Sequence, residues 1–467
     1  MNIHIKSLLA AIVFSFLLYS KSIGLNLFLI SIIVVTLLTS SKKNTKTLWG
    51  FNFAYIFTAA MVFVDPSSFK IFIHLMSFLL LIGKTISEKS SLYISWFIGL
   101  VNMAIASIYH LNRYLKQPIS EKKRLSPQLI NSIKGVFIAV VLLLLFTTLY
   151  KNANPVFDDL VSQINLDFIS VPWLFFTLIG YFLFLHILQP YKPKKLILLD
   201  LAQKNQLKAP EEPFSEQNLI KSESEHTLGS IIFMTLNTLL AFFLVTDIMY
   251  LLNSDVVSNA TYSKSVHQGI YALLFSIICA IIIILYFFRG NLNFFNKNQL
   301  LKSLSYLWVI LNTILVFFTF YKNYMYVEAL GLTYKRIGVF VYLLLTITGL
   351  CTTYLKVAQI KSFMYLVRTN IAAFFAFLFL STTIPWDKAI TSYNLRHIKN
   401  PDIPYLINLG DSNSSILYTY TTYQNNHAKK DQTNLIHQKY ARFVKEQTEK
   451  MWQEYTIYQL KNGLSKW

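Results

Sequence analysis

The stretch "ALLFSIICAIIIILYFF", residues 272–288, decides the fold class because it is a long apolar run without a charged residue. Two more runs, "AVVLLLLFTTLY" at 139–150 and "YLWVILNTILVFFTFY" at 306–321, have the same character. A helix of about 20 apolar residues crosses a bilayer core of about 30 Å. Only helices and closed barrels satisfy their backbone there, and these runs lack the alternation of barrel strands. We therefore predict an all-α fold, a polytopic transmembrane helical bundle.

The composition of the whole chain supports this class. Its 467 residues are 54% hydrophobic and 14% charged, and the mean hydropathy is +0.46. A soluble protein of this length carries a larger share of charge. The formal net charge of +20 comes from Lys and Arg clustered between apolar runs, where they set orientation and meet anionic lipid headgroups. The expected partner of this charge is the lipid bilayer, and no nucleic acid.

Apolar segments long enough to be membrane spans recur along the first 384 residues, and we expect eleven or twelve true spans. The first is short, and Lys70, His74 and Lys84 break the fourth. Met1–Ser20 is similar to a signal peptide, but it lacks a small-x-small cleavage pattern, which favours an uncleaved first helix. The segments lie near residues 7–20, 22–40, 47–64, 67–86, 91–111, 132–150, 171–190, 229–252, 269–288, 303–321, 337–355 and 367–384.

Basic residues are distributed unevenly among the segments between these runs. Residues 112–128, 191–208, 289–302 and 356–368 are rich in Lys and Arg, whereas the turns between them are poor in both. The positive-inside rule places the basic segments on the cytoplasmic side. The chain after the last apolar segment is therefore expected on the extracytoplasmic side.

The first 130 residues do not fit a simple alternation. "SSKKNTK" at 40–46 and the segment 112–131 are both basic and should share one side, yet three apolar segments separate them. An odd number of crossings cannot bring the chain back to the same side. We therefore expect one of the three segments to be interfacial or re-entrant.

Composition also divides the chain. Residues 191–228 contain a stretch rich in Glu, Ser, Lys and Pro, which predicts a cytoplasmic flexible linker. The linker separates an N-terminal transmembrane half, residues 1–190, from a C-terminal half, residues 229–384. Residues 385–467 form a small polar C-terminal tail. No internal repeat is visible, so the sequence does not support an inverted-repeat transporter.

The end of the tail has helical periodicity. Thr433 or Asn434 is a candidate cap for an amphipathic helix. Such a helix either lies on the membrane surface or packs on the rest of the tail, and packing is the more common outcome. The apolar positions are Ile436, Tyr440, Phe443, Met451, Tyr455 and Tyr458, with Trp452 among them.

Short motifs in a fixed order carry a family resemblance. They are "NPVFDDL" at 154–160, "DIMYLL" at 247–252, "YSKSVHQGIYALL" at 262–274, "YVEALGLTYKRIGVFVYLLLT" at 326–346 and "IPWDKAITSYNLRHIKNPDIPYLINLGDSNSSIL" at 384–417. Over roughly residues 130–460 the chain resembles an uncharacterised family of bacterial multi-spanning membrane proteins, a domain of unknown function. The resemblance implies a multi-pass protein of the bacterial cytoplasmic (inner) membrane. It carries over no catalytic or binding residue.

Ionisable residues gather in the segments expected to face outward. Such a group costs about 2.5–3.5 kcal/mol at the centre of a span, and less near its ends, unless it is paired or wetted. Each therefore needs a partner or a function. The candidate outer-face polar cluster is Asp158, Asp159, Asp247, Tyr250, Tyr262, His267, Glu328 and Arg336.

Two interpretations of this cluster remain open. In the structural one, Asp247 and His267 interact and close a turn between two helices. Thr333 then caps the following helix, and Arg336 reaches a carboxylate or a lipid headgroup.

In the functional interpretation, the groups converge on one outward-facing pocket. A His beside a carboxylate shuttles protons or orients a base. By analogy with membrane glycosyltransferases, Asp158 and Asp159 would handle a lipid-linked phosphate donor.

The sequence contains no metal-ligand spacing, nucleophile motif or Gly-rich phosphate loop, so we predict no metal, no cofactor and no catalytic residue. Cys279 and Cys351 lie in apolar segments and are expected to pack there. The favoured function is an envelope sensory or accessory scaffold with a membrane or envelope protein partner. A small-solute transporter and a membrane glycosyltransferase-like enzyme using a lipid-linked donor are the alternatives.

Overall fold

The structure, a computed structural model, describes residues 2–41, 45–116, 127–158, 171–209, 216–252, 275–423 and 430–461. Over these residues the secondary structure is helical, apart from an isolated antiparallel bridge between Gln206 and Lys361. Eight of the described helices are long and apolar enough to cross a membrane. The predicted all-α, multi-spanning architecture is confirmed.

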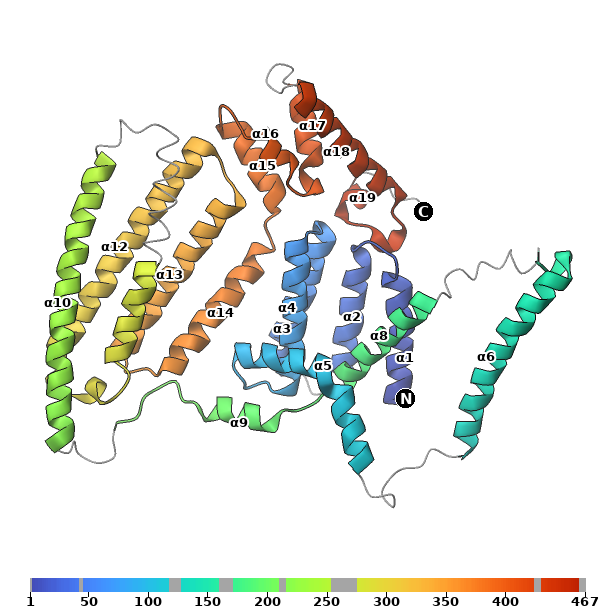
Figure 1. Ribbon diagram of the computed structural model, residues 1–467, viewed down its shortest axis with the longest axis horizontal. Coiled ribbons are helices and arrows are strands. Elements are labelled where there is room, and N and C mark those ends of the chain that lie inside the picture. The colour runs from blue at the N-terminus through green and yellow to red at the C-terminus, as the bar shows by residue number, and fades with distance from the viewer. Residues whose placement is uncertain are drawn as a thin grey trace.

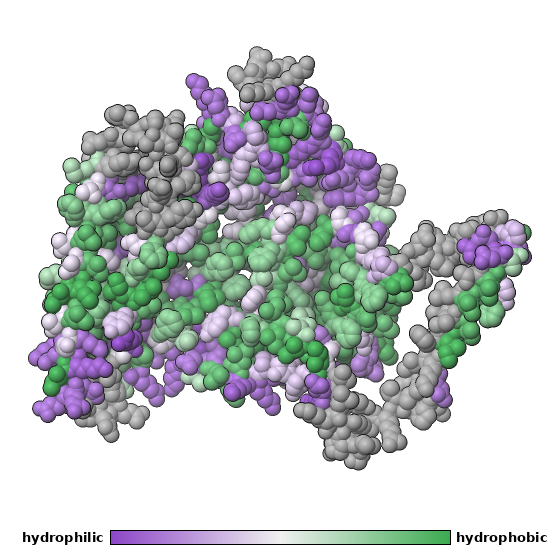
Figure 2. Space-filling model, in the orientation of Figure 1, coloured by the Kyte–Doolittle hydropathy of each residue, from purple (hydrophilic) through white to green (hydrophobic). Residues whose placement is uncertain are grey.

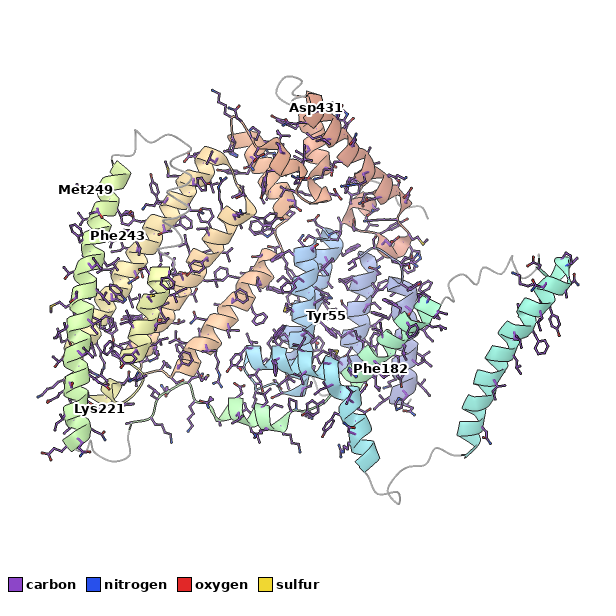
Figure 3. All side chains as sticks on the ribbon, in the orientation of Figure 1. Tyr55, Phe182, Lys221, Phe243, Met249 and Asp431 are labelled. Carbon is purple, nitrogen blue, oxygen red and sulfur yellow. The ribbon has the colours of Figure 1, made fainter. Side chains whose placement is uncertain are left out.

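The helices of the first half pack around one apolar core, which includes Tyr55, Leu81, Ile98 and Phe184. The sequences of α1, α2, α3 and α8 are apolar on nearly every side, as expected of helices that face either lipid or another helix. Figure 3 shows Tyr55 inside this group, whereas Phe182 of α8 is 40% exposed. The helices are α1 (Ile3–Leu18), α2 (Leu25–Ser41), α3 (Lys46–Val64), α4 (Ser68–Ile86), α5 (Leu92–Lys116) and α8 (Val171–Leu188).

The second half has a separate apolar core, which includes Phe233, Ile277, Leu315 and Leu350. Figure 1 shows α14 tilted between the two halves. The helices are α10 (Glu216–Leu252), an apolar helix at Phe275–Phe287, α12 (Gln299–Leu330), α13 (Tyr334–Ala358) and α14 (Phe363–Ser381), with a short 3-10 turn, η3 (Asn291–Phe294), before α12.

The surface has the layering that a bilayer requires. Figure 2 shows a hydrophobic band across the helices, with hydrophilic residues above and below it. Large apolar side chains of the long helices are exposed, for example Phe53 of α3 at 67% and Phe242 of α10 at 68%. Lipid tails solvate such side chains at no cost, whereas water would not.

The polar tail folds over one end of the spans and has its own small core, which includes Ile390, Leu406, Leu417 and Ile436. Figure 3 labels Asp431 at the start of α18, at the end of the molecule opposite Lys221. The tail elements are α15 (Trp386–His397), α16 (Ile403–Ile407), η4 (Asp411–Asn413), α17 (Ser414–Tyr423), α18 (Lys430–Glu449), η5 (Trp452–Glu454) and α19 (Ile457–Lys461).

The predicted amphipathic helix of the tail is α18, and it packs on the tail. Ile436 and Phe443 are buried, at 1% and 8% exposure. The helix begins at Lys430, before the expected caps, and ends at Glu449. Met451 and Tyr455 therefore follow the helix, because the chain turns through η5 there.

Two further helices, α6 (Pro127–Ala153) and α9 (Lys194–Ala202), complete the described part of the chain. α6 stands apart at one side in Figure 1. α9 lies at the end of the molecule opposite the tail. We call these two ends the tail end and the α9 end.

The segment expected to be a flexible linker contains two helices, α9 and the first turns of α10. The residues just after α9 also dock on the start of α14. Ser362 donates its backbone N–H to the Asn205 carbonyl at 2.9 Å, and Leu207 donates to the Ile360 carbonyl at 3.1 Å. Residues 205–207 of the predicted linker therefore form hydrogen bonds with the start of α14. Residues 210–215 lie outside the described part of the chain, and the predicted flexibility of the linker stays a prediction.

The expectation that charges break the fourth apolar segment is wrong, because α4 is continuous. Lys70 pairs with Asp65 at 3.1 Å. His74 lies between the hydroxyls of Ser31 and Thr58, at 3.2 and 3.0 Å, in the core of the first half. Lys84 donates to the carbonyls of the turn that follows α4. Each polar group is satisfied, so the helix does not need to end.

Of the three apolar segments at 47–64, 67–86 and 91–111, the last, α5, has the contacts expected of an interfacial or re-entrant segment. Ser91, just before α5, donates its backbone N–H to Asp200 of α9 at 2.7 Å. Toward the other end, the His110 ring lies 3.1 Å from the Gln189 carbonyl, just past the end of α8. Although α5 satisfies the length and composition of a span, both of its ends therefore lie at the α9 end.

Candidate functional site

A cavity of about 910 Å³ lies where the tail meets the spans. We call it the tail cavity. Its walls come from the α1–α2 and α3–α4 turns, the first turns of α4, α13 and α15, the end of α14, the loop at 410–412 and the end of α18. Segments far apart in the sequence therefore form one hollow at the tail end.

The walls of the tail cavity differ in chemistry. The spans contribute apolar side chains, among them Ile71, Ile337, Val341 and Leu378. The tail contributes ionisable side chains, which are Asp387, Asp411, Glu446 and Lys450. A hollow with an apolar wall toward the bilayer and a charged wall toward water matches the two ends of an amphiphile.

Asp65 lies in the α3–α4 turn and joins the spans to the tail. One carboxylate oxygen lies 3.1 Å from Lys70 Nζ, and the other lies 3.6 Å from Lys388 Nζ of α15. Lys70 is buried, with 3% of its side chain exposed. The sequence places the turn here because Pro66 follows Asp65 and Ser67 caps α4 by accepting the Lys70 N–H.

Tyr334, the first residue of α13, makes a second link. Its hydroxyl donates to Asp387 Oδ1 at 2.7 Å, and its backbone N–H donates to the Tyr405 hydroxyl at 3.0 Å. Burial raises the pKa of Tyr405, so this phenol stays neutral and keeps its oxygen available as an acceptor.

The α12–α13 turn docks closely on α15. Asn394 donates its amide to the Leu332 carbonyl at 2.9 Å, and its Oδ1 accepts the Leu332 N–H. Gly331 ends α12 with φ +87°, and a Cβ there would meet Asn394 Oδ1 at 2.6 Å. Only glycine fits both the left-handed conformation and the close approach.

The last part of the tail docks on the α1–α2 turn. Ser22 donates its backbone N–H to Glu454 Oε1 at 2.6 Å, and Leu25 donates to the Tyr455 carbonyl at 2.8 Å. The Trp452 ring lies 6.4 Å from the Phe16 ring. The tail therefore contacts turns from both halves of the membrane part.

Lys439 fixes the loop that carries Gly410 and Asp411. Its ammonium donates to the carbonyls of Ile407 and Leu409, at 2.8 and 2.7 Å, and to Asn413 Oδ1 at 2.9 Å. Burial lowers the pKa of Lys439, while Asp411 and Asp387 act in the opposite direction. This buried cation therefore fixes the position of the loop that carries Asp411, one of the charged residues lining the cavity.

A second, smaller cavity of about 230 Å³ adjoins the first at Leu378, on the side away from the tail. It lies between α3, α4, the start of α5 and α14. Leu378 lines both cavities, and below it the walls are apolar, with Phe375 and Phe379 of α14, except for the hydroxyl of Ser77. We call this the chain cavity.

The residues predicted from the sequence do not meet in either cavity, as far as the structure describes them. Asp247 pairs instead with Lys322 of α12, in a pair whose side chains are 8% and 14% exposed. Asp158 pairs with Lys151 on the separate α6 segment, at 3.1 Å. Asp159, Tyr262, His267 and the side chain of Tyr250 lie outside the described residues, and so does the expected Asp247–His267 contact.

Glu328 and Arg336 flank the α12–α13 turn. Thr333 caps α13, as predicted, by accepting the Arg336 N–H. Arg336 is partly exposed and forms no ion pair with a carboxylate among the described residues. Its guanidinium donates to the Leu330 carbonyl at 2.9 Å and lies 4.0 Å from the Tyr326 ring. Glu328 is exposed and lies near Tyr393, whose pKa is raised by burial and by neighbours that include Glu328.

The residues of the tail cavity were missed because single residues carry little signal. Asp65 follows an apolar segment directly, and Asp387 lies in the motif "IPWDKAITSYN". Both stand at the ends of apolar segments facing the predicted outer side. That shared position is the signal that could have found them. Among the described residues, no group of three or more His, Cys, Asp or Glu side chains could hold a metal ion.

Fold and site together define a multi-spanning helical membrane protein whose polar tail closes a cavity at one membrane face. The sequence matches the family described as "Domain of unknown function (DUF4153)" over residues 8–420, and the chain belongs to this family. The match includes the tail as far as α17, and so most of the tail cavity. No curated protein and no solved structure matches the chain.

Proposed function

We propose that this protein is an envelope sensory or accessory scaffold of the bacterial cytoplasmic membrane that binds an amphiphilic lipid or lipid-linked molecule in the tail cavity. The tail lies on the extracytoplasmic side. A membrane or envelope protein partner binds the protein in a way that depends on the position of the tail.

One observation carries the proposal: the tail cavity combines apolar side chains from the spans with ionisable side chains from the tail and from Asp65 of the α3–α4 turn. The volume of about 910 Å³ lies within the range of small-molecule sites, about 300–1,000 Å³. The chain cavity adds an apolar continuation along α14. An amphiphile can therefore place its headgroup under the tail and its hydrocarbon between the two halves.

The tail is suited to report on such binding because three turns of the membrane part hold it. Lys388 meets the α3–α4 turn, Asp387 and Asn394 meet the α12–α13 turn, and Glu454 meets the α1–α2 turn. A ligand that fits one arrangement of these contacts better than another shifts the tail toward it.

The transporter and transferase alternatives have less support. A transporter needs a polar path through the spans, whereas the chain cavity is apolar apart from one hydroxyl. A transferase needs a base held beside the donor, and the structure gives Asp158, Asp247 and Glu328 no shared site among its described residues.

Photo-crosslinking tests the proposal. The full chain is placed in vesicles that contain a phospholipid with a diazirine in its acyl chain, and labelled peptides are mapped by mass spectrometry. We expect labelling of α14 around Phe375–Phe379. Leu378→Trp should block it, because the larger ring fills the wall shared by the two cavities.

The matched control is Leu380→Trp, since Leu380 is on the same helix and is 59% exposed. This control should label like the wild type. If Leu378→Trp and Leu380→Trp label alike, α14 meets only bulk lipid and the proposed binding site is wrong.

A further inference from the structure

The charged wall of the tail cavity contains a carboxylate that no cation balances directly. Asp65 pairs with Lys70 and Lys388, and Asp411 pairs with Arg442 at 3.0 Å. Among the described residues, Asp387 has a hydroxyl partner, Tyr334, and no cation within ion-pair distance. Lys439 interacts with Asp387 only through longer-range electrostatics, because the Lys439 ammonium is already hydrogen-bonded to other oxygens of the tail.

The same wall contains a cation that is not matched by an ion pair. Lys450 lines the cavity just after α18 and forms no salt bridge among the described residues. Burial lowers the pKa of Lys450, and the nearby Glu454 and Glu446 oppose this change. An anion in the cavity would favour the charged form of Lys450 further.

Backbone groups favour an anion at the same place. The first turn of α4, which begins at Ser68, lines the cavity. A helix N-terminus presents unpaired N–H groups and the positive end of the helix dipole. The hydroxyls of Ser68 and Ser412 also line the hollow and can donate to an oxyanion.

The adjoining chain cavity indicates which class of molecule carries the two charges of the ligand. Leu378 lines both cavities, so the space between α14 and α3–α4 adjoins the place of a headgroup under the tail at this side chain. A small soluble zwitterion would leave that apolar space unused. A lipid chain would fill it and remain in contact with the bilayer.

We infer that the ligand of the tail cavity is an aminophospholipid, whose ammonium binds Asp387, whose phosphate binds Lys450 and the N-terminus of α4, and whose acyl chain lies in the chain cavity. This inference rests on the proposed function, because it names the class of amphiphile that the cavity holds. The Tyr334 hydroxyl orients the Asp387 carboxylate from one side. The other carboxylate oxygen lies beside Gly410, has no hydrogen bond or ion pair among the described residues, and is the atom that would accept from the ammonium.

Two diazirine lipids with the same acyl chains test the headgroup: phosphatidylethanolamine and phosphatidylglycerol. In wild-type protein, the phosphatidylethanolamine probe should label α14 around Phe375–Phe379 about tenfold more than the phosphatidylglycerol probe. A charge-assisted hydrogen bond supplies a difference of that order. The two probes share the phosphate and differ in the ammonium, so the ratio reports on Asp387.

Two substitutions separate the two charges. Asp387→Asn keeps an acceptor for Tyr334 but removes the negative charge, so it should bring the two probes to similar labelling. Lys450→Gln should weaken both probes by about tenfold, because both contain the phosphate. The controls Glu449→Gln and Lys445→Gln alter an exposed pair on α18, with side chains 66% and 74% exposed, and should change neither ratio.

The outcomes distinguish this inference from the proposed function. Equal labelling by both probes, blocked in each case by Leu378→Trp, overturns the aminophospholipid and leaves amphiphile binding in place. Labelling that Leu378→Trp does not alter overturns both. A wild-type preference for phosphatidylethanolamine that persists in Asp387→Asn overturns the assignment of the ammonium site.

Discussion

Single charged residues at the tail end decide how firmly the tail is held. Asp65 is the clearest case, because it neutralises the buried Lys70 and also meets Lys388 of the tail. A buried ion pair contributes little relative to apolar residues of the same size, but removing one partner leaves an uncompensated charge. The two partners of Asp65 should therefore respond differently to mutation.

We expect Asp65→Asn to lower the free energy of unfolding by about 3–5 kcal/mol, because Lys70 is left buried without a counter-charge. Lys388→Gln should cost at most about 1 kcal/mol, since that side chain is 41% exposed. Thermal unfolding of the purified protein in detergent measures both. Equal losses would show that Lys70 finds another partner or reaches water.

The residue scale is also where the sequence was least informative. Thr333 was recognised as a cap because capping depends on a few neighbouring residues. Lys70, His74 and Lys84 were misread as a break in a span, because their partners Asp65, Ser31 and Thr58 and the turn after α4 become visible only when helices pack.

At the scale of elements, α5 is an apolar segment of spanning length that we expect not to cross the bilayer. Its sequence satisfies the length and composition criteria. Its position follows from contacts at both ends, Ser91 with Asp200 and His110 with Gln189. The basic segments at 40–46 and 112–131 predicted that one of the three apolar segments between them does not cross the membrane. They could not identify which one, because the positive-inside rule indicates only whether the number of crossings is odd or even.

Cysteine accessibility tests the position of α5. In a background without Cys279 and Cys351, we expect cysteines at Lys89 and Arg113 to react with a membrane-impermeant maleimide from the same side of sealed vesicles. Both positions flank the apolar part of α5 at the α9 end. Reaction from opposite sides would mean that α5 crosses the bilayer.

The α9 helix joins the two halves at the other end of the molecule. Asp200 accepts hydrogen bonds from Ser91 and lies 3.1 Å from Arg368 of α14. Burial alone would raise the pKa of Asp200, but the hydrogen bonds from Ser91 and the Arg368 guanidinium outweigh it and hold the pKa below its usual value. The charged carboxylate therefore stabilises the docked segment above its ordinary pKa, and this contribution is lost as the pH falls through the lowered value.

Limited trypsin digestion of the protein in nanodiscs tests this docking. We expect Lys204 to be cut slowly in the wild type, because Ser362 binds its carbonyl and Arg368 binds the preceding one. Asp200→Asn should speed cleavage there several-fold. Cleavage after Lys221, in the exposed first part of α10, is the internal control. If the cleavage rate at Lys204 does not change, the segment is held by its backbone contacts alone.

At the scale of the whole molecule, the length of the apolar runs predicted the class of fold and the position of almost every apolar helix. Length and apolarity are local properties, so a single sequence contains them. The tail cavity could not be predicted in this way. It is formed by Asp65, Tyr334, Leu378, Asp387 and Lys450, which lie on five separate elements and meet only after the tail folds back over both halves.

The arrangement of the basic segments leads to the last prediction, the orientation of the tail. Residues 191–208 and 356–368 are basic and lie together at the α9 end, where Ser362 donates to Asn205 and Arg368 meets Asp200. Thr45, beside the basic segment at 40–46, donates to Glu88 in the turn before α5.

Because the positive-inside rule places such segments in the cytoplasm, the tail at the opposite end should be extracytoplasmic. Alkaline phosphatase fused after Asn400 should be active in cells, since it folds only where its disulfides form, and a green fluorescent protein fusion at the same point should be dark. The same two reporters inserted after Lys208 should give the reverse pattern, as an internal control. A fluorescent, phosphatase-negative fusion after Asn400 would invert the molecule, place the tail cavity at the cytoplasmic face and remove the proposed envelope role.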